Sequence, residues 1–295
     1  MEKIKVVVVG NCQARPLAKL LESLNPSIVV TVTAIVHLLK SEQFSEYQKY
    51  FEEADLIVSQ LVLDSYPCDF VQTGFLKSRY KEKVVSIVNL YFNGYTPDWF
   101  YIRIPGRGAL RGPMGDYHNR TIFEAWREGS SQDVAEKRLL SEEYNEIYKS
   151  ELKKSLLALK ERESKVDVKI TDFLESKFRK ERLFFTFNHP NMFLLREYAK
   201  RILSYSDIKV KGKWLPFRVK DVEMLDQFIP LANPSMGLPT LAGDLHKGVK
   251  FEFDSEDMIK IGRKKYYNSR EIVETYFQIY EKLNESLNLK ELVKS

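Results

Sequence analysis

The sequence predicts an α/β fold in which helices flank a mostly parallel central sheet, with a helical insertion and an irregular C-terminal region. Short apolar runs, beginning with the four valines at 6–9, alternate with helical segments along the first third of the chain. Continuous runs of this kind are typical of strands that are covered on both faces, as in a parallel sheet. Several of the runs end on polar residues, which indicates a ligand site at one edge of the sheet.

The order of the first elements follows from spacing and turn residues. The valine strand ends at Gly10, and the helix after it has Pro16 near its start and leucines at helical spacing. Asn25 and Pro26 end this helix. We then expect a strand at 28–36, a helix at 41–54, a strand at 55–60, a helix at 70–80 and a strand at 84–89.

Three of the predicted strands finish on polar side chains. The first ends on Asn11 and Cys12, the next on Ser59 and Gln60, and the last on Asn89. In open α/β sheets, ligands bind in the crevice outside the carboxyl ends of the strands. We therefore expect these side chains to meet at one ligand-binding crevice.

The remaining chain changes in character several times. A Gly-, Pro- and Arg-rich loop at 103–115 precedes helices at about 119–180, and a strand at 183–187 precedes a helix. That helix has an apolar face, and a final helix is expected at 269–287. We predict an α/β core at 1–118 and 181–206, a helical insertion at 119–180 and a C-terminal extension packed on the core at 207–295.

Composition narrows the class of protein. The chain has 295 residues and a net charge of +5, which suits an enzyme with anionic ligands but is too weak for a nucleic-acid-binding protein. Cys12 and Cys68 form no zinc-type spacing and no disulfide framework, so we expect neither a metal site nor an oxidising compartment. No apolar stretch approaches the ~20 residues of a spanning helix. A cytoplasmic protein without a transmembrane segment is expected.

Cys12 is the first candidate for chemistry. A thiol at a helix N-terminus is stabilised as the nucleophilic thiolate by the helix dipole and free backbone N–H groups. Asn11 and the amides of the same turn could hold a developing oxyanion. The alternatives are a small buried hydrophobe or a turn that binds phosphate without covalent chemistry. The absence of GxGxxG and GxxxxGK[ST] motifs argues against a dinucleotide or P-loop site.

His189 is the preferred general base for this cysteine. It lies between an apolar strand and an amphipathic helix, and Pro190 stiffens the turn. A Cys–His pair needs closeness in space and not in sequence. A lone histidine is more often a surface or core residue, however. His118 is the best substitute base, and His37 and His246 rank lower.

Arginines recur in the glycine-rich loop, at Arg103, Arg107 and Arg111. Guanidinium groups on a flexible backbone could clamp phosphates through charge-assisted hydrogen bonds. The alternative is a solvated loop with no ligand.

Three segments carry a resemblance to a known family. They are Gly-Asn-Cys-Gln at 10–13, Asn-Gly-Tyr-Thr-Pro-Asp at 93–98 and Phe-Asn-His-Pro at 187–190. With these segments the chain resembles, over about its first 200 residues, the WcbI-like family of predicted acetyltransferases of capsular-polysaccharide biosynthesis. The resemblance implies a coenzyme A-binding α/β protein that moves an acetyl group to a sugar hydroxyl.

The chain is also remotely similar to SGNH hydrolases. In those enzymes a serine occupies the position that Cys12 holds here, and a histidine precedes the last core helix, as His189 does. They carry an aspartate three residues before that histidine, whereas this chain has Thr186. Asn188, Asp116 or a backbone carbonyl could orient the imidazole instead.

Sequence and resemblance together predict a CoA-dependent acyltransferase, with acetyl-CoA as donor and a glycan or glycan precursor as acceptor. Cys12, His189 and Asn11 are the expected catalytic residues, either through a thioester on Cys12 or through direct transfer with His189 as base. The residues expected to bind the cofactor are Gly10, Gln13, Arg15, Ser59, Gln60, Asn93, Arg107, Arg111, His118 and Asn188.

Two other functions stay open at this point. One is a thiol esterase or hydrolase of SGNH-like build, with water as the acceptor. The other is a non-catalytic module that binds CoA or a nucleotide-sugar within a surface-polysaccharide assembly. A homo-oligomer is compatible with the sequence.

Overall fold

The computed structural model describes residues 3–212, 224–240, 243–253 and 259–292 and confirms the α/β class. The chain divides into two compact units. Unit 1 comprises Met1–Tyr91, Leu157–Lys177 and His189–Leu225, and unit 2 comprises Phe92–Leu156, Phe178–Asn188 and Asp226–Ser295. No helix among the described residues is long and apolar enough to cross a membrane.

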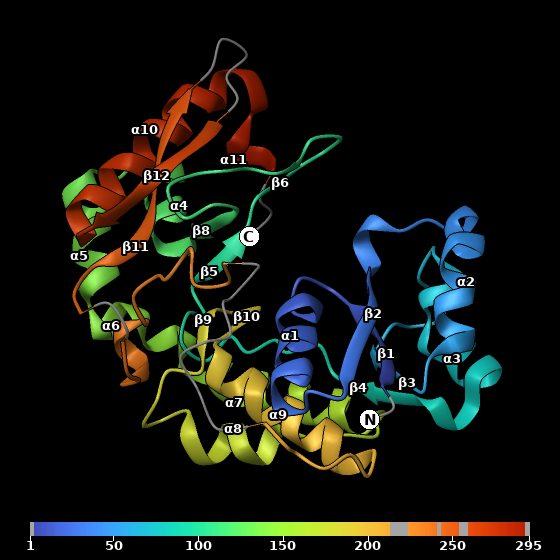
Figure 1. The fold of residues 1–295 in the computed structure, drawn as a ribbon. Coiled ribbons are helices and arrows are strands. Elements are labelled where there is room, and N and C mark those ends of the chain that lie inside the picture. Colours follow the sequence, from blue (N-terminus) through green and yellow to red (C-terminus); the bar gives the residue numbers. More distant parts are fainter. Residues whose placement is uncertain (1–2, 213–223, 241–242, 254–258, 293–295) are drawn as a thin grey trace. The chain divides into compact units, whose positions relative to one another are not determined.

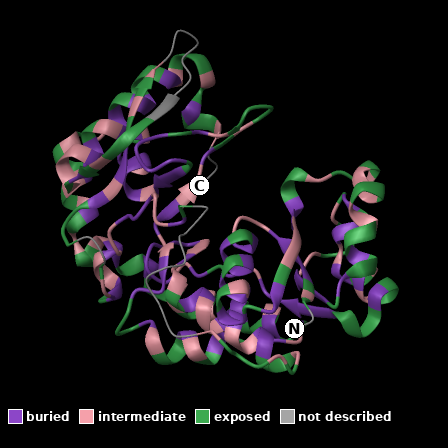
Figure 2. Cartoon of the chain, in the orientation of Figure 1, coloured by how far each residue is buried: buried purple, intermediate pink, exposed green. Residues whose placement is uncertain are grey.

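Unit 1 is built on a parallel sheet of four strands in the order β2-β1-β3-β4 (Figure 1). The strands are β1 (Ile4–Gly10), β2 (Ile28–Ile35), β3 (Leu56–Gln60) and β4 (Val84–Ile87). All four coincide with predicted strands. Figure 2 shows β1 and β3 as buried, and the valines at 6–9 are fully inaccessible to solvent. Because β1 connects to β2 on one side and lies beside β3 on the other, the topological switch point falls between β1 and β3.

The helices of unit 1 flank this sheet. They are α1 (Ala14–Leu24), α2 (Phe44–Glu53), α3 (Thr73–Tyr80), the second half of α7 (Lys149–Glu163), α8 (Thr171–Lys177) and α9 (Met192–Tyr205). Short 3₁₀ turns and one two-residue strand complete the unit: η1 (Val36–Leu38), η2 (Ser41–Gln43), η3 (Asp69–Val71), η4 (Lys81–Lys83) and β10 (His189–Pro190).

Helices α1 and α9 pack against each other and run in the same direction. Asn25, at the end of α1, donates from Nδ2 to the carbonyl of Lys209 at 2.9 Å, and Leu24 accepts from the N–H of Gly212 at 2.7 Å. Lys209 lies four residues beyond α9. The four residues from the end of α9 to Lys209 span at most about 14 Å, which is less than the ~21 Å length of α9. The C-termini of α1 and α9 therefore lie together. The two N-termini therefore point toward the same end of unit 1.

Unit 2 has an aromatic core around its long C-terminal helix. Helix α10 (Ser269–Leu287), at the predicted position, buries Tyr276, Phe277 and Tyr280 and packs on α4 (Arg120–Arg127) and α5 (Gln132–Leu140). The C-terminal region is less irregular than predicted, because β11 (His246–Phe253) and β12 (Ile259–Tyr267) form an antiparallel hairpin.

The remaining elements of unit 2 are short. Strands β5 (Trp99–Tyr101) and β8 (Tyr117–Asn119) are paired, as are β6 (Arg103–Ile104) and β7 (Gly108–Ala109). The others are α6 (Glu142–Asn145), η5 (Glu146–Tyr148), the first half of α7, β9 (Phe184–Thr186), η6 (Pro234–Met236) and α11 (Leu289–Leu292).

These units do not coincide with the boundaries proposed from sequence. Residues 92–118 belong to unit 2 and not to the sheet-bearing core, the described residues 207–212 and 224–225 belong to unit 1, and α7 contributes to both units. The reason is the core of unit 2, where Trp99 and Tyr117 pack with Tyr276 and Tyr280 from the other end of the chain. Composition along the chain does not show which distant segments share a core.

The Asn-Gly-Tyr-Thr-Pro-Asp segment lies in the interior of unit 2. The Tyr95 hydroxyl donates to the carbonyl of Glu181 at 2.8 Å and accepts from the N–H of Leu183 at 3.1 Å. Asp98 is buried and accepts from Asn119 Nδ2 at 2.6 Å. Burial raises the pKa of Asp98 to about 6. This segment therefore serves the packing of unit 2.

The substitution Asp98→Asn tests that role through pH. Because the pKa of Asp98 is about 6 when folded and near 3.8 otherwise, the folded protein holds this proton more tightly than the unfolded chain. The stabilisation is complete below about pH 4 and is lost as pH rises through about 6, a change of about 3 kcal/mol. Urea unfolding between pH 4 and 8 should show Asp98→Asn gaining stability relative to wild type as pH rises. A constant difference would contradict this expectation.

Candidate functional site

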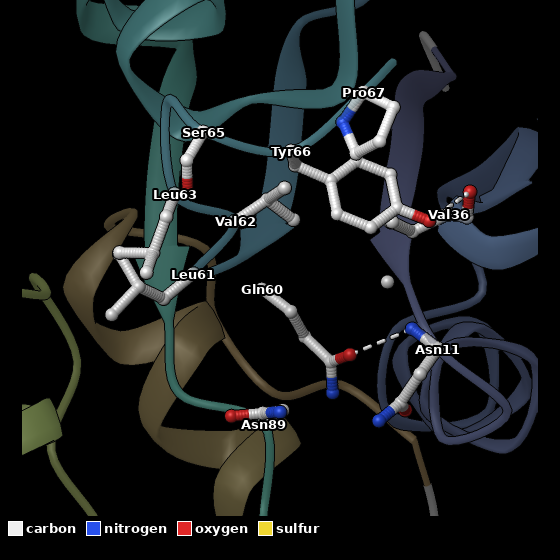
Figure 3. Close-up of a pocket in the computed structure, with 11 residues that line it drawn as sticks. Asn11, Val36, Gln60, Leu61, Val62, Leu63, Ser65, Tyr66, Pro67 and Asn89 are labelled. Carbon is white, nitrogen blue, oxygen red and sulfur yellow. Dashed lines mark hydrogen bonds between the residues drawn. The ribbon is translucent and has the colours of Figure 1, made fainter. Parts of the chain in front are cut away.

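A pocket of about 330 Å³ lies at the carboxyl edge of the sheet in unit 1 (Figure 3). Gly10 and Asn11 come from the end of β1, Gln60 from the end of β3, and Asn89 from the segment after β4. Asn11, Gln60 and Asn89 thus meet at one crevice, as expected, whereas Cys12 and Ser59 are not among the residues that line it. The pocket lies at the switch point between β1 and β3, where open α/β sheets bind ligands.

The wall of the pocket is mainly apolar and comes from the loop after β3, with Val36 added from η1. Val62 donates from its N–H to Thr73 Oγ1 at 2.9 Å and accepts from the Thr73 N–H at 3.0 Å, which anchors the loop to α3. Tyr66 donates from its hydroxyl to the carbonyl of Val36 at 3.2 Å. The wall residues are Val36, Leu61, Val62, Leu63, Ser65, Tyr66 and Pro67.

Sequence reasoning missed this wall. The available signal was Leu-Val-Leu at 61–63, an apolar run directly after the polar end of a strand. Leu63 is 61% exposed, which is unusual for a leucine that packs within a core. An exposed apolar wall beside polar strand ends is typical of a small-molecule pocket.

Gln60 sets the floor of the pocket by contact with the β1 turn. Its Oε1 accepts from the backbone N–H of Asn11 at 2.8 Å (Figure 3). A Cβ placed on Gly10 would lie 2.5 Å from the same oxygen. Glycine at position 10 therefore permits Gln60 to approach the backbone of the turn.

Gln13 holds this turn to the segment after β4 and is itself only 1% exposed. Its Oε1 accepts from Gln60 Nε2 and from the N–H of Leu90, both at 3.0 Å. Its Nε2 donates to the carbonyl of Leu90 at 2.7 Å. The predicted cofactor ligand Gln13 is thus a buried tie between three segments of unit 1.

Cys12 lies between Asn11 and Gln13, at the start of α1, and is partly exposed. It is not among the residues that line the pocket, whereas its neighbour Asn11 is. The other cysteine, Cys68, is buried, and burial raises the pKa of its thiol. The two cysteines therefore differ in exposure, with Cys12 the more accessible.

His189 also belongs to unit 1 and is partly exposed. It forms β10 with Pro190, and α9 begins at Met192, with Asn191 Oδ1 accepting from the N–H of Leu194 at 2.9 Å. Because α1 and α9 are packed and parallel, Cys12 and His189 each precede a helix N-terminus at the same end of the unit.

Two other predicted ligands of unit 1 differ in accessibility. Ser59 is fully buried in β3, and its hydroxyl donates to the carbonyl of Gln60 at 3.2 Å, so it does not reach the pocket. Arg15 is exposed on the first turn of α1.

His118 is a core residue of unit 2 and not a surface base. It is fully buried, with Nε2 3.0 Å from the carbonyl of Leu110 and Nδ1 2.9 Å from the Tyr280 hydroxyl. Since a carbonyl only accepts, Nε2 carries the hydrogen and Nδ1 accepts from Tyr280. Burial lowers the pKa of His118 to about 4. The polar turn in the sequence gave no sign of this packing, and we leave His118 out of the site.

Asn188, Asn93, Arg107 and Arg111 belong to unit 2 as well. Asn188 Oδ1 accepts from the Tyr117 hydroxyl at 2.7 Å, and the partly exposed Asn93 donates from its backbone N–H to a serine hydroxyl at 2.8 Å. The first part of the arginine-rich loop forms the β6–β7 hairpin, with the exposed Arg107 in its turn, and the exposed Arg111 lies two residues beyond β7. Among the described residues, no group of three His, Cys, Asp or Glu side chains could hold a metal ion.

Fold and pocket define an α/β protein with its pocket at the switch point of a parallel sheet and a cysteine where the first strand meets the first helix. The family described as "Polysaccharide biosynthesis enzyme WcbI" matches residues 5–211, more than two thirds of the chain. The protein belongs to this WcbI family of polysaccharide biosynthesis enzymes. The family named by the sequence motifs is thereby confirmed.

A solved structure of WcbI is similar to this one. The TM-score is 0.64 at 20% identity, and the match covers 98% of this chain and 97% of the other. That structure is described as the native protein without a disulfide bond between coenzyme A and a cysteine. No curated protein matches the chain.

The substitution Gln13→Leu tests the buried tie. It leaves the N–H and carbonyl of Leu90 and the Gln60 amide without their partner, and each unsatisfied buried group costs about 1–3 kcal/mol. We expect urea unfolding to show a loss of several kcal/mol. Arg15→Ala, an exposed change on the same helix, should stay within about 0.5 kcal/mol of wild type. Equal effects of the two substitutions would show that Gln13 does not hold the turn.

Proposed function

We propose that this protein is a CoA-dependent acyltransferase, with acetyl-CoA as donor and a glycan or glycan precursor as acceptor. The carrying observation is the partly exposed Cys12 at the N-terminus of α1, next to a pocket floored by amide groups. Membership of a polysaccharide biosynthesis family supports the class of acceptor. The description of the similar WcbI structure names a cysteine together with CoA, and we assign that relation to Cys12 here.

The pocket suits the acyl end of such a donor. Its volume of about 330 Å³ is within the range of small-molecule sites. The apolar wall from Leu61 to Leu63 favours the methyl group and the carbon chain of the pantetheine arm. Asn11 Oδ1 accepts from the Gln13 N–H at 2.9 Å, so the Asn11 amide nitrogen keeps both of its hydrogens for a ligand oxygen.

The transfer proceeds in two steps. The Cys12 thiol gives up its proton and its Sγ attacks the thioester carbonyl, the bond from carbon to the CoA sulfur breaks, and CoA leaves as a thiol after taking the proton that Cys12 released. His189 then removes the proton from a sugar hydroxyl, whose oxygen attacks the acetyl group and releases Cys12. In the variant without an acyl-enzyme, His189 activates the hydroxyl for direct attack on acetyl-CoA, and Cys12 with Asn11 positions the thioester.

Intact-mass spectrometry after incubation with acetyl-CoA tests the covalent step. We expect an adduct of +42 Da, about the mass of an acetyl group, that is absent in Cys12→Ser. His189→Ala should retain the adduct but pass it on about 10²–10⁴ times more slowly.

The other outcomes identify the alternatives. Rapid loss of the adduct in water alone, unaffected by any glycan, would indicate a thioesterase. CoA binding in calorimetry without an adduct or turnover would indicate a non-catalytic CoA-binding module. Absence of both adduct and CoA binding would overturn the proposed function.

We further propose that Arg107 in the turn of the β6–β7 hairpin and Arg111 just after it bind phosphate groups of CoA. Both side chains are exposed, and Arg111 lies 3.8 Å from Asp116 in a solvent-exposed ion pair that contributes little by itself. We expect Arg107→Ala with Arg111→Ala to raise the Kd for CoA about tenfold or more, with a smaller effect at high salt. The double variant Lys153→Ala/Lys154→Ala, which removes two exposed charges from α7, is the matched control. Equal CoA affinities for wild type and the arginine variant would leave the hairpin as a solvated loop.

A further inference from the structure

Asn89 lines the pocket with an amide whose orientation is fixed by a neighbouring cation. Arg162 Nη1, from the second half of α7, donates to Asn89 Oδ1 at 3.0 Å and to the Asn89 carbonyl at 3.2 Å. A guanidinium has donors only, so the atom that faces it must be the amide oxygen. The Asn89 nitrogen therefore carries its two hydrogens away from Arg162, and Figure 3 shows it on the Gln60 side of the pocket.

A second amide in the pocket is oriented in the same sense. Asn11 Oδ1 accepts from the Gln13 N–H, which leaves the Asn11 nitrogen for the pocket. The Gln60 amide is already used at both ends, by Asn11 and Gln13. Among the described residues that line the pocket, Asn11 and Asn89 are thus the side chains whose amide nitrogens keep both hydrogens for a ligand, whereas Gln60 Nε2 donates one of its two to Gln13. They suit a ligand oxygen that accepts hydrogen bonds and gathers negative charge.

The position of Arg162 does not depend on Asn89 alone. Its Nη2 donates to the carbonyl of Tyr91 at 3.2 Å. The next residue, Glu163, is buried and accepts from the N–H of Thr171 at 2.9 Å, and also from that of Ile170. Asp167 then accepts from the Ser86 N–H of β4 at 2.7 Å. The end of α7 is therefore fixed to the sheet, and the guanidinium with it.

The charge of Arg162 lacks a carboxylate partner among the described residues. The hydrogen bonds of its guanidinium go to the Asn89 side chain and to the carbonyls of Ala158, Asn89 and Tyr91. Burial lowers the pKa of Arg162, a direction that an anionic neighbour would oppose. A partly buried cation bonded to the Asn89 oxygen polarises that amide and strengthens its N–H groups as donors.

We propose that Arg162 is a positioning residue that fixes and polarises the Asn89 amide, so that Asn89 donates to the carbonyl oxygen of the acyl donor. The inference rests on the proposed acyl transfer. As Cys12 Sγ attacks, the carbonyl oxygen gains negative charge, and the Asn89 and Asn11 donors stabilise it more strongly than the neutral thioester. Arg162 contributes through Asn89, without touching the donor.

Asn89→Asp separates this role from a structural one. The carboxylate forms an ion pair with Arg162 and carries no hydrogen to donate, so we expect thermal stability equal to or above that of wild type. The rate of acetyl adduct formation should nevertheless fall about 10²–10³-fold, as for the loss of one donor to an oxyanion. If Asn89 had only a structural role, the activity of the variant would fall only together with its stability.

A double-mutant cycle tests the dependence of Arg162 on Asn89. Arg162→Gln should slow adduct formation about 10–100-fold through kcat, with the KM for acetyl-CoA and the Kd for CoA within about threefold of wild type. In the Asn89→Ala background the same substitution should cost less than about threefold, because its effect passes through Asn89. Arg201→Gln, which removes a partly buried arginine bonded to Asp172 and the Lys169 carbonyl, is the structural control and should not slow the reaction.

The outcomes separate this inference from the proposed function. If wild type forms the adduct but Arg162→Gln does so within threefold of its rate, or costs equally in both backgrounds, Arg162 is not a positioning residue. If Asn89→Asp retains full activity, the donor role of Asn89 is overturned. If wild type itself forms no adduct and binds no CoA, the proposed function fails first and the inference falls with it.

Discussion

The amide of Gln13 is the interaction on which the geometry of the pocket depends. It joins the Cys12 turn to Leu90 and to Gln60, and Gln60 in turn accepts from the N–H of Asn11. One buried chain of hydrogen bonds therefore fixes the ends of β1 and β3 to the segment after β4. An unpaired buried amide destabilises the folded protein, so the hydrogen bonds of these groups form together and are lost together. The direction of their donors also decides what is left for a ligand: N–H groups at the floor and an apolar wall above.

The residues that hold the site differ from those that face a ligand. Gln13 and Ser59 are polar residues at strand ends, but the side chains of both form hydrogen bonds with backbone groups inside unit 1. Asn11 and Asn89 occupy similar positions in the sequence, yet each has its oxygen held by a protein donor and its nitrogen left for the pocket. The same residue type thus serves packing or recognition according to its partners, which act from elsewhere in the chain.

In unit 2, several titratable side chains likewise serve packing. Asp98, His118 and His246 lie in its interior, where burial raises the pKa of the carboxyl and lowers those of the two imidazoles. The Asn-Gly-Tyr-Thr-Pro-Asp motif, one of the three segments that carry the family resemblance, is part of this interior. A motif can therefore be typical of a family because it builds the core and not because it lines the pocket.

The sequence by itself determined the parallel strands, the helices between them and the crevice at their ends, because these depend on local periodicity and on a general rule for α/β sheets. Only the tertiary structure decided that His118 is buried, that Gln13 is a tie, and that Leu61–Leu63 forms a wall. It also brought Arg162 to Asn89 across more than seventy residues of chain. Such contacts have no periodic signature, because they depend on which distant segments share a core, and Arg162 looks like any other charged residue on an exposed helix until that core is formed.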